Sequence, residues 1–284
     1  MQLDQLTAQA DLAACWATHA SEQLGSDLPL VAQLRLYLTA RRAERIVGDA
    51  AGQRSRGIAD RFNDRAAAAG DYADQLLRGP AEDVLDAALD ARTRGIAAPA
   101  LAEFVRRLSR ASHVAGPTAS ANSLRLRLRQ LGAEFDVLEE RADCAAVFGG
   151  KPFHDCTTDD ISAVECRVWS ATLFGTRPLP PDVCGPLREA FTALCIHQFR
   201  RYDLRNGCRL FGCLCMVSDP DPSFLTSVIG FLLLQQRPDG TFGYYGRELS
   251  RLGVLPAWKR VALVEAPTTL ACLTALADAE ARLR

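Results

Sequence analysis

Residues 224–243 read FLTSVIGFLLLQQRPDGTFG and carry the clearest structural pattern in the chain. The opening apolar run contains no charged residue and is long enough for a helix. Asp239-Gly240 then provides a turn that tolerates a residue with positive φ. The Gln236 amide can bond backbone groups that the helix end leaves open, and Phe242 is expected to stack back onto the helices. The stretch therefore predicts a helix followed by a tight turn.

The rest of the chain also reads as helices, because apolar residues recur with a period of 3.6 and breakers separate the periodic segments. A cap at Ser26 or Asp27, with Pro29 in the first turn, opens one helix, and Gly48 ends it. Further helices are expected at 58–77, 80–95, 99–116, 160–174, 186–201, 208–217, 224–236 and 267–283.

Residues 123–131 fit two structures. Alternation of Leu124, Leu126 and Leu128 with arginines suits a strand, whereas Leu124, Leu128 and Leu131 suit a helix. No second strand of similar quality lies nearby, so we expect a helix. The sequence thus predicts an all-α protein built from helical hairpins.

A breaker cluster at Gly149-Gly150 is the best candidate boundary. It divides the chain into an N-terminal helical half, residues 1–150, and a C-terminal half, residues 151–284. The two halves can also form one continuous domain.

The amino-acid composition limits the kinds of binding partner that the sequence favours. Hydrophobic residues make up 48% and charged residues 24% of the 284, and the net charge is -1. This charge supplies no field that would attract nucleic acid or an anionic membrane. All the cations except Lys151 and Lys259 are arginines. We interpret this as coding bias in preference to arginine-rich phosphate recognition, the alternative that the guanidinium fork suits.

The start of the sequence and its apolar runs bear on where in the cell the protein is expected. No basic region followed by an apolar run opens the chain, so no secretory signal is expected. The apolar run 228–234 is far shorter than the roughly 20 residues of a spanning helix. We therefore expect a cytoplasmic protein without a membrane span.

Ten cysteines are present, none in a C-x-x-C pair, and Cys213-x-Cys215 has poor spacing for zinc. In a reducing compartment they are expected to be buried thiols with no bound metal. A metal site and a reactive thiol are the alternatives.

Gln236, Asp239-Gly240 and Phe242 together resemble the repeat of terpene cyclases and prenyltransferase β-subunits. In those families a helix ends with Gln, a D-G turn follows, and an aromatic ring, usually Trp, closes the hairpin. The resemblance implies that the C-terminal half forms part of an α/α toroid, whose inner helices enclose an apolar cavity.

A second stretch, 157–163, is similar to the D-x-D-D-T-A motif of class II terpene cyclases, in which the middle aspartate protonates an alkene or epoxide. Asp159 matches that acid and Asp160 its neighbour, while Thr157 replaces the first aspartate. Adjacent carboxyls suit acid catalysis because one ionised partner raises the pKa of the other. The alternative is that Thr157, Thr158 or Asp159 caps the following helix, with Asp160 in its first turn.

Four further residues are candidates for substrate binding. Trp169 lies about two and a half turns after Asp160, and we expect it to share approximately the same helix face and line the cavity. His154 could form an acid–base group with its neighbour Asp155. Tyr244 and Tyr245 follow the turn and could overhang the cavity mouth.

The function predicted from these features is an enzyme of specialised metabolism. It would bind a small, largely apolar molecule and promote acid-assisted cyclisation or rearrangement. No cofactor is expected, because phosphate-binding loops and Rossmann motifs are absent from the sequence. The alternative is a non-catalytic helical scaffold or small-molecule carrier, and either protein could be a homodimer. Carboxylates that face a cavity would favour the enzyme, and carboxylates bonded to helix N–H groups would favour the scaffold.

Overall fold

The computed structural model describes residues 2–48, 52–69, 72, 76, 81–111, 119–133, 148, 155–243 and 255–283. Every regular element within these residues is a helix, so the predicted all-α class is confirmed. The ambiguous leucine–arginine segment is helical, as predicted.

The helices are α1 (Gln2–Leu24), α2 (Leu30–Val47), α3 (Gly52–Ala68), α5 (Ala81–Thr93), α6 (Pro99–Ala111), α7 (Ala119–Gln130), α9 (Thr158–Thr172), α10 (Pro181–Arg200), α11 (Leu204–Val217), α12 (Pro222–Leu234), α14 (Ala257–Arg260), η4 (Val261–Glu265) and α15 (Ala266–Leu283). The last three are continuous, and η4 is a turn of π-helix.

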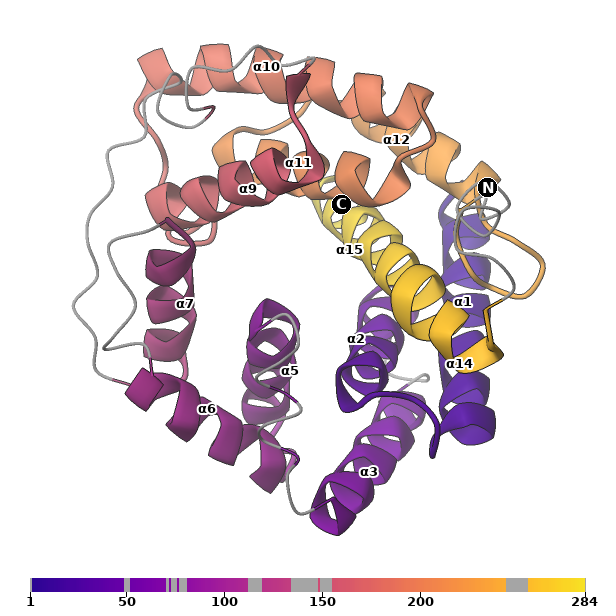
Figure 1. Cartoon of the computed structure of the whole chain (residues 1–284). Coiled ribbons are helices and arrows are strands. Elements are labelled where there is room, and N and C mark those ends of the chain that lie inside the picture. Colours follow the sequence, from indigo (N-terminus) through magenta and orange to yellow (C-terminus); the bar gives the residue numbers. More distant parts are fainter. Residues whose placement is uncertain are drawn as a thin grey trace.

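The helices form an inner and an outer layer around a common axis (Figure 1). The inner helices α2, α5, α7, α9, α11 and α15 contact one another in that order, and α15 contacts α2. Helices α1, α3, α6, α10 and α12 lie outside them. The inner layer is therefore a closed ring of helices. This alternation is what an α/α toroid would have, and membership of that class stays a prediction.

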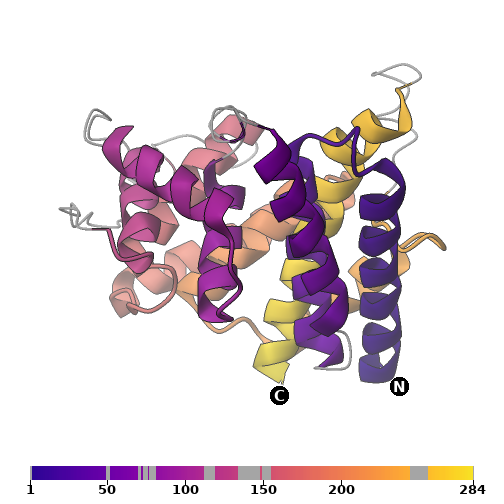
Figure 2. The same ribbon diagram turned by 90° about the horizontal axis from the view of Figure 1, so that it is seen from below.

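Neighbouring inner helices run in the same direction. In three neighbouring pairs, a contact later in one helix is made to a later residue of its partner. Helices α2 and α5 are joined by Arg35–Asp83 and then Arg41–Asp90. The same order holds for Thr158–Asn206 and Glu165–Arg209 between α9 and α11, and for Cys208–Cys272 and Cys215–Arg282 between α11 and α15. Arg35 of α2 also bonds the Ala262 carbonyl just before α15. The amino-terminal ends of α2, α5, α9, α11 and α15 consequently lie at one end of the ring. Figure 2 shows the layers from below.

The apolar core lies between the two layers. One cluster joins α9, α10, α11, α12 and α15 to the first half of α1, and its largest fully buried side chains include Phe191, Phe211 and Phe242. A second cluster joins α2, α3, α5 and α6 to the second half of α1, around Phe104. Burying side chains of this size contributes roughly 1.5–3 kcal/mol each. Helix α1 therefore connects the two clusters.

Several helix starts differ from the sequence prediction. Helices α3, α10 and α11 begin at Gly52, Pro181 and Leu204, before the predicted starts at 58, 186 and 208. Pro29 is the N-cap residue of α2 and no side chain caps that helix, so the predicted cap at Ser26 or Asp27 is wrong. The Ser26 hydroxyl bonds Asp27 instead. Helix α10 begins at Pro181 and contains Pro186. Pro186 is the sixth residue of this helix and has no N–H to donate to the Asp182 carbonyl, so it removes one intrahelical hydrogen bond.

The segment 257–283 is the one described helical stretch that is long and apolar enough to cross a membrane. Within its most apolar part, 67% is buried inside the protein, where α15 packs against α2 and α11. Core helices of this kind meet the same criteria of length and composition.

The turn after α12 has the predicted form. Asp239 Oδ1 accepts a hydrogen bond from the Thr241 backbone N–H at 3.0 Å, and Gly240 adopts a φ of 94°. The Gln236 amide donates to the Gly240 carbonyl at 3.0 Å and to the Gln9 carbonyl of α1 at 2.8 Å. Phe242 is fully buried. The turn therefore fastens α12 onto the first helix.

Replacement of Gly240 by alanine should weaken this attachment. A Cβ there would lie 2.5 Å from the Leu12 carbonyl oxygen, and the left-handed φ disfavours any side chain. We expect a loss of about 1–3 kcal/mol in the free energy of unfolding. The matched control is Gly212→Ala in α11, where no atom lies within 4 Å of the added Cβ. This change should stabilise the protein by about 0.4–1 kcal/mol. Urea denaturation measures both, and equal effects would contradict the role of the turn.

Candidate functional site

Charged side chains from the inner helices meet around the ring axis. Electrostatic interactions through space join arginines of one inner helix to carboxylates of other inner helices. We call this set the axial cluster, and it comprises Arg35, Arg42, Glu82, Asp83, Asp86, Arg127, Glu165, Arg205 and Arg209. The side chains at the centre of the ring are therefore charged, and the apolar cavity that the resemblance implies stays a prediction.

Three of these arginines have carboxylate partners. Arg35 Nε lies 2.7 Å from Asp83 Oδ2, and Arg209 Nε lies 2.9 Å from Glu165 Oε2. Arg127 pairs with Asp86. Burial lowers the pKa of Arg127 to about 10, so it stays charged at neutral pH. These pairs link α2 to α5, α9 to α11, and α5 to α7.

Arg205 has no such partner. It forms no ion pair or hydrogen bond with any residue that the structure describes. Its side chain is exposed, yet burial lowers its pKa, and the nearby cations Arg35 and Arg209 lower it further. Asp83 and Glu165 act in the opposite direction, but each is already paired. The Arg205 side chain therefore reaches solvent although many protein atoms surround it.

The position of Arg205 in its helix is also unfavourable. It lies in the first turn of α11, which contains no acidic residue. The amino-terminal end of a helix carries a partial positive charge that repels cations. Asp203 caps the helix, but its carboxylate is engaged, because it accepts hydrogen bonds from the backbone N–H and the side-chain amide of Asn206. Arg205 is therefore held against both the helix dipole and its cationic neighbours.

Aromatic rings border the axial cluster at α9. The Arg127 guanidinium lies 4.6 Å from the ring centroids of both Trp169 and Phe174, which are 5.5 Å apart. Phe174 has a φ of 57° and the preceding Leu173 a φ of 46°. Such left-handed residues cost about 1–3 kcal/mol each. The Phe174 N–H bonds the Trp169 carbonyl at 2.9 Å, which holds this conformation in place.

Trp169 lies one turn after Glu165 and borders the cluster on the same face of α9. The expectation that Trp169 shares a face with Asp160 is wrong. Nine residues make about two and a half turns, which places the two on opposite faces. Trp169 thus reaches the ring interior without Asp160 beside it.

The predicted acid pair lies at the start of α9, where Thr157 is the N-cap residue. Asp160 Oδ2 accepts hydrogen bonds from the Thr157 N–H at 2.9 Å and from its hydroxyl at 2.7 Å. The Asp160 N–H donates back to Thr157 Oγ1 at 3.3 Å, which completes a capping box. Asp159 is exposed. This geometry favours the capping alternative, and catalysis by either carboxylate stays a prediction.

The other predicted substrate-binding residues, His154, Tyr244 and Tyr245, lie outside the residues that the structure describes. Of the predicted set, the structure therefore places Asp159, Asp160 and Trp169, and it does not bring them together.

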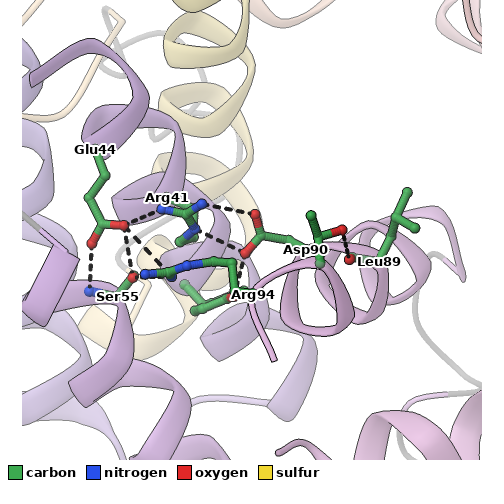
Figure 3. Close-up of polar contacts among 8 residues, drawn as sticks. Arg41, Glu44, Ser55, Leu89, Asp90 and Arg94 are labelled. Atoms are coloured by element: carbon green, nitrogen blue, oxygen red, sulfur yellow. Dashed lines mark hydrogen bonds and ion pairs between the residues drawn. The ribbon is translucent and has the colours of Figure 1, made fainter. Parts of the chain in front are cut away.

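A second polar cluster joins α2, α3 and α5 (Figure 3). Glu44 is 3% exposed and accepts hydrogen bonds from the Ser55 N–H at 3.0 Å and the Ser55 hydroxyl at 2.9 Å. Arg41 pairs with both Glu44 and Asp90, and Arg94 Nη1 bonds the Ser55 hydroxyl at 3.0 Å. Ser55 is fully buried, so it is out of reach of a substrate. The cluster holds the three helices together.

Tyr37 connects this cluster to a small apolar cavity. Its hydroxyl donates to Asp90 Oδ2 at 2.5 Å, and burial raises its pKa, so the phenol stays neutral. The cavity, between α2, α3, α5 and α6, has a volume of about 10 Å³. That space holds about one water molecule. An organic ligand does not fit there.

The described cysteines are free thiols. Burial raises the pKa of Cys195, Cys208 and Cys213 well above the ordinary value, which suppresses their reactivity. Within the described ranges, no three His, Cys, Asp or Glu side chains are grouped to hold a metal ion.

The fold and the axial cluster thus define an all-α protein with a ring of parallel helices around charged side chains. Comparison of the chain with protein-family models, curated proteins and solved structures finds no match. The resemblance to terpene cyclases and prenyltransferase β-subunits stays a prediction from the sequence.

Sequence reasoning missed the axial cluster. Two signals could have indicated it. Arg35 and Arg42 lie seven residues apart on one face of α2, and Arg205 occupies a first turn without a carboxylate. Both were hidden by the abundance of arginine throughout the chain.

The Asp160 carboxylate should matter more for stability than that of Asp159. Both lie in the first turn of α9, so both gain from the helix dipole, but Asp160 also makes the bonds of the capping box. We expect Asp160→Ala to cost about 1 kcal/mol more than Asp159→Ala. Urea denaturation of the two variants measures the difference. Equal losses would remove the capping role of Asp160.

Substitution of Glu44 should lower the free energy of unfolding far more than substitution of Asp160. Glu44→Ala leaves Arg41 and Arg94 short of a buried partner, which should cost about 3–5 kcal/mol in the free energy of unfolding. Glu103→Ala is the control, because Glu103 pairs with the more exposed Arg106 and Arg107 on α6. Its loss should cost far less, because exposed ion pairs contribute little to stability. The same denaturation assay compares them, and similar losses would contradict a structural role for the cluster.

Proposed function

We propose that this chain is a non-catalytic carrier of a small anionic molecule, which it binds inside the helix ring at Arg205. The observation that carries the proposal is the state of Arg205 itself. It is an accessible cation, without a partner among the described residues, at a helix end that repels it.

The charge around Arg205 fits one anionic group. Asp83 and Glu165 are already paired with Arg35 and Arg209, so Arg205 is the cation that is left without a partner. A bound carboxylate or phosphate would balance the remaining cation and would gain from the dipole of α11. The guanidinium fork can bond two oxygens of such a group at once.

The aromatic rings beside Arg127 indicate what the rest of the ligand could be. Trp169 and Phe174 are partly buried and offer apolar surface beside Arg127. A ligand held by its anionic group could lay an apolar part against these rings. This revises the largely apolar molecule expected from the sequence to one with an anionic end.

The capping box supports a carrier over an enzyme. Acid-assisted cyclisation requires a carboxyl that gives a proton to the substrate. The Asp160 carboxylate accepts two hydrogen bonds from Thr157, and Asp159 is exposed at the same helix end. Neither belongs to the axial cluster, so a ligand bound at Arg205 would not need them.

Substitution of Arg205 tests the proposal with inorganic phosphate as the probe. Arg205→Gln should weaken phosphate binding at least about tenfold, since it removes the unpaired charge. The free variant should also be more stable by about 0.3–1 kcal/mol, because a cation is removed from a helix amino-terminus. Isothermal titration calorimetry and urea denaturation measure the two effects.

The control is Arg188→Gln, which changes an exposed arginine of the outer helix α10. Phosphate binding and stability should both stay close to those of the unmodified protein. If Arg205→Gln bound phosphate as the unmodified protein does, the proposed site would be lost.

A further inference from the structure

A second group of arginines lies at the opposite end of the ring from Arg205. Arg42 and Arg45 lie two and three turns after Arg35 on α2, toward the carboxyl-terminal ends of the inner helices. Asp278 of α15 faces them, close to the end of that helix. None of the three forms an ion pair with a described residue.

Arg45 has the same combination of properties as Arg205. Its side chain is exposed, yet burial lowers its pKa, with a further contribution from Arg42. A carboxyl-terminal helix turn favours a cation, which accounts for an arginine at position 45 without any ligand. That explanation does not extend to Arg42, which lies deeper in the helix. Its Nε is buried and has no hydrogen-bond partner within the described part of the chain.

The other charges near this position are already engaged. Arg41 and Asp90 also face Arg45, but they pair with each other. Arg282 faces Asp278 but bonds the Cys215 carbonyl at 2.6 Å. Arg42 and Arg45 therefore share one carboxylate, that of Asp278, and one positive charge remains over.

We propose that Arg42 and Arg45 form a second anion-binding position, and that the ligand is an elongated molecule with an anionic group at each end. Arg35 and Arg45 are ten residues apart on α2, which is roughly 15 Å along a helix. Arg42 on one side and Asp83 and Glu165 on the other all act through space on Arg127, so this arginine is within electrostatic reach of both positions. The second position does not depend on the proposed function. The single bridging ligand does, because it rests on the proposed binding of an anion at Arg205.

Equilibrium dialysis against radiolabelled inorganic phosphate counts the positions. The unmodified protein should bind two phosphate ions per chain, and Arg45→Gln and Arg205→Gln should each bind one. Arg188→Gln should keep both. Two ions bound by Arg45→Gln, or one by the unmodified protein, would overturn the second position. One ion bound by Arg45→Gln and two by Arg205→Gln would support the second position and overturn the proposed function at Arg205.

A linear polyphosphate long enough to reach both positions tests the bridge. One chain should bind per protein, with an affinity at least about a hundredfold above that of phosphate, since the second contact is intramolecular. Either single substitution should remove this gain and leave the affinity near that of phosphate. Two polyphosphate chains per protein, or no gain over phosphate, would show two independent anion sites and overturn the bridging ligand.

Discussion

The parallel direction of the inner helices is the constraint on which the interior depends. Because α2, α5, α9, α11 and α15 begin at one end of the ring, their dipoles add, and this end is electrostatically positive. First-turn carboxylates offset this on two of them: Glu82 and Asp83 on α5, and Asp159 and Asp160 on α9. Helix α11 instead has Arg205 in its first turn. The same architecture that favours acids at this end therefore isolates one cation there.

Closure of the ring depends on few local features. Helix α1 contributes to both apolar clusters, and the turn after α12 fastens onto it through Gln236 and Gly240. The close approach of Gly240 to the Leu12 carbonyl leaves no room for a side chain. A short motif near the carboxyl-terminal end of the chain thus connects elements more than two hundred residues apart. Its physical role here is assembly of the outer layer, and the charged interior is built by other residues.

Much of the fold could be predicted from the sequence, because helices depend on local periodicity and local breakers. Gly48 ended α2 and Pro99 opened α6 as expected, and the leucine–arginine segment is helical. Helix starts were less predictable, since a capping side chain has close competitors. Thr157 caps α9, whereas no side chain caps α2. The axial cluster could not be read in this way, because Arg35 and Arg205 meet only once the ring closes.

The axial cluster is hard to explain as a device for stability. Buried ion pairs such as Arg209–Glu165 lose about as much in desolvation as they gain in attraction, and apolar side chains of similar volume often stabilise a protein more. Burial lowers the pKa of Arg127 and raises that of Glu165, so both are less stable in their charged forms than in water. Arg205 and Arg42 add unpaired cations to this cost. A ring that served only as a scaffold would be more stable with leucines at these positions. Charges held on an axis where they weaken the fold are best explained by a ligand whose anionic groups complete them.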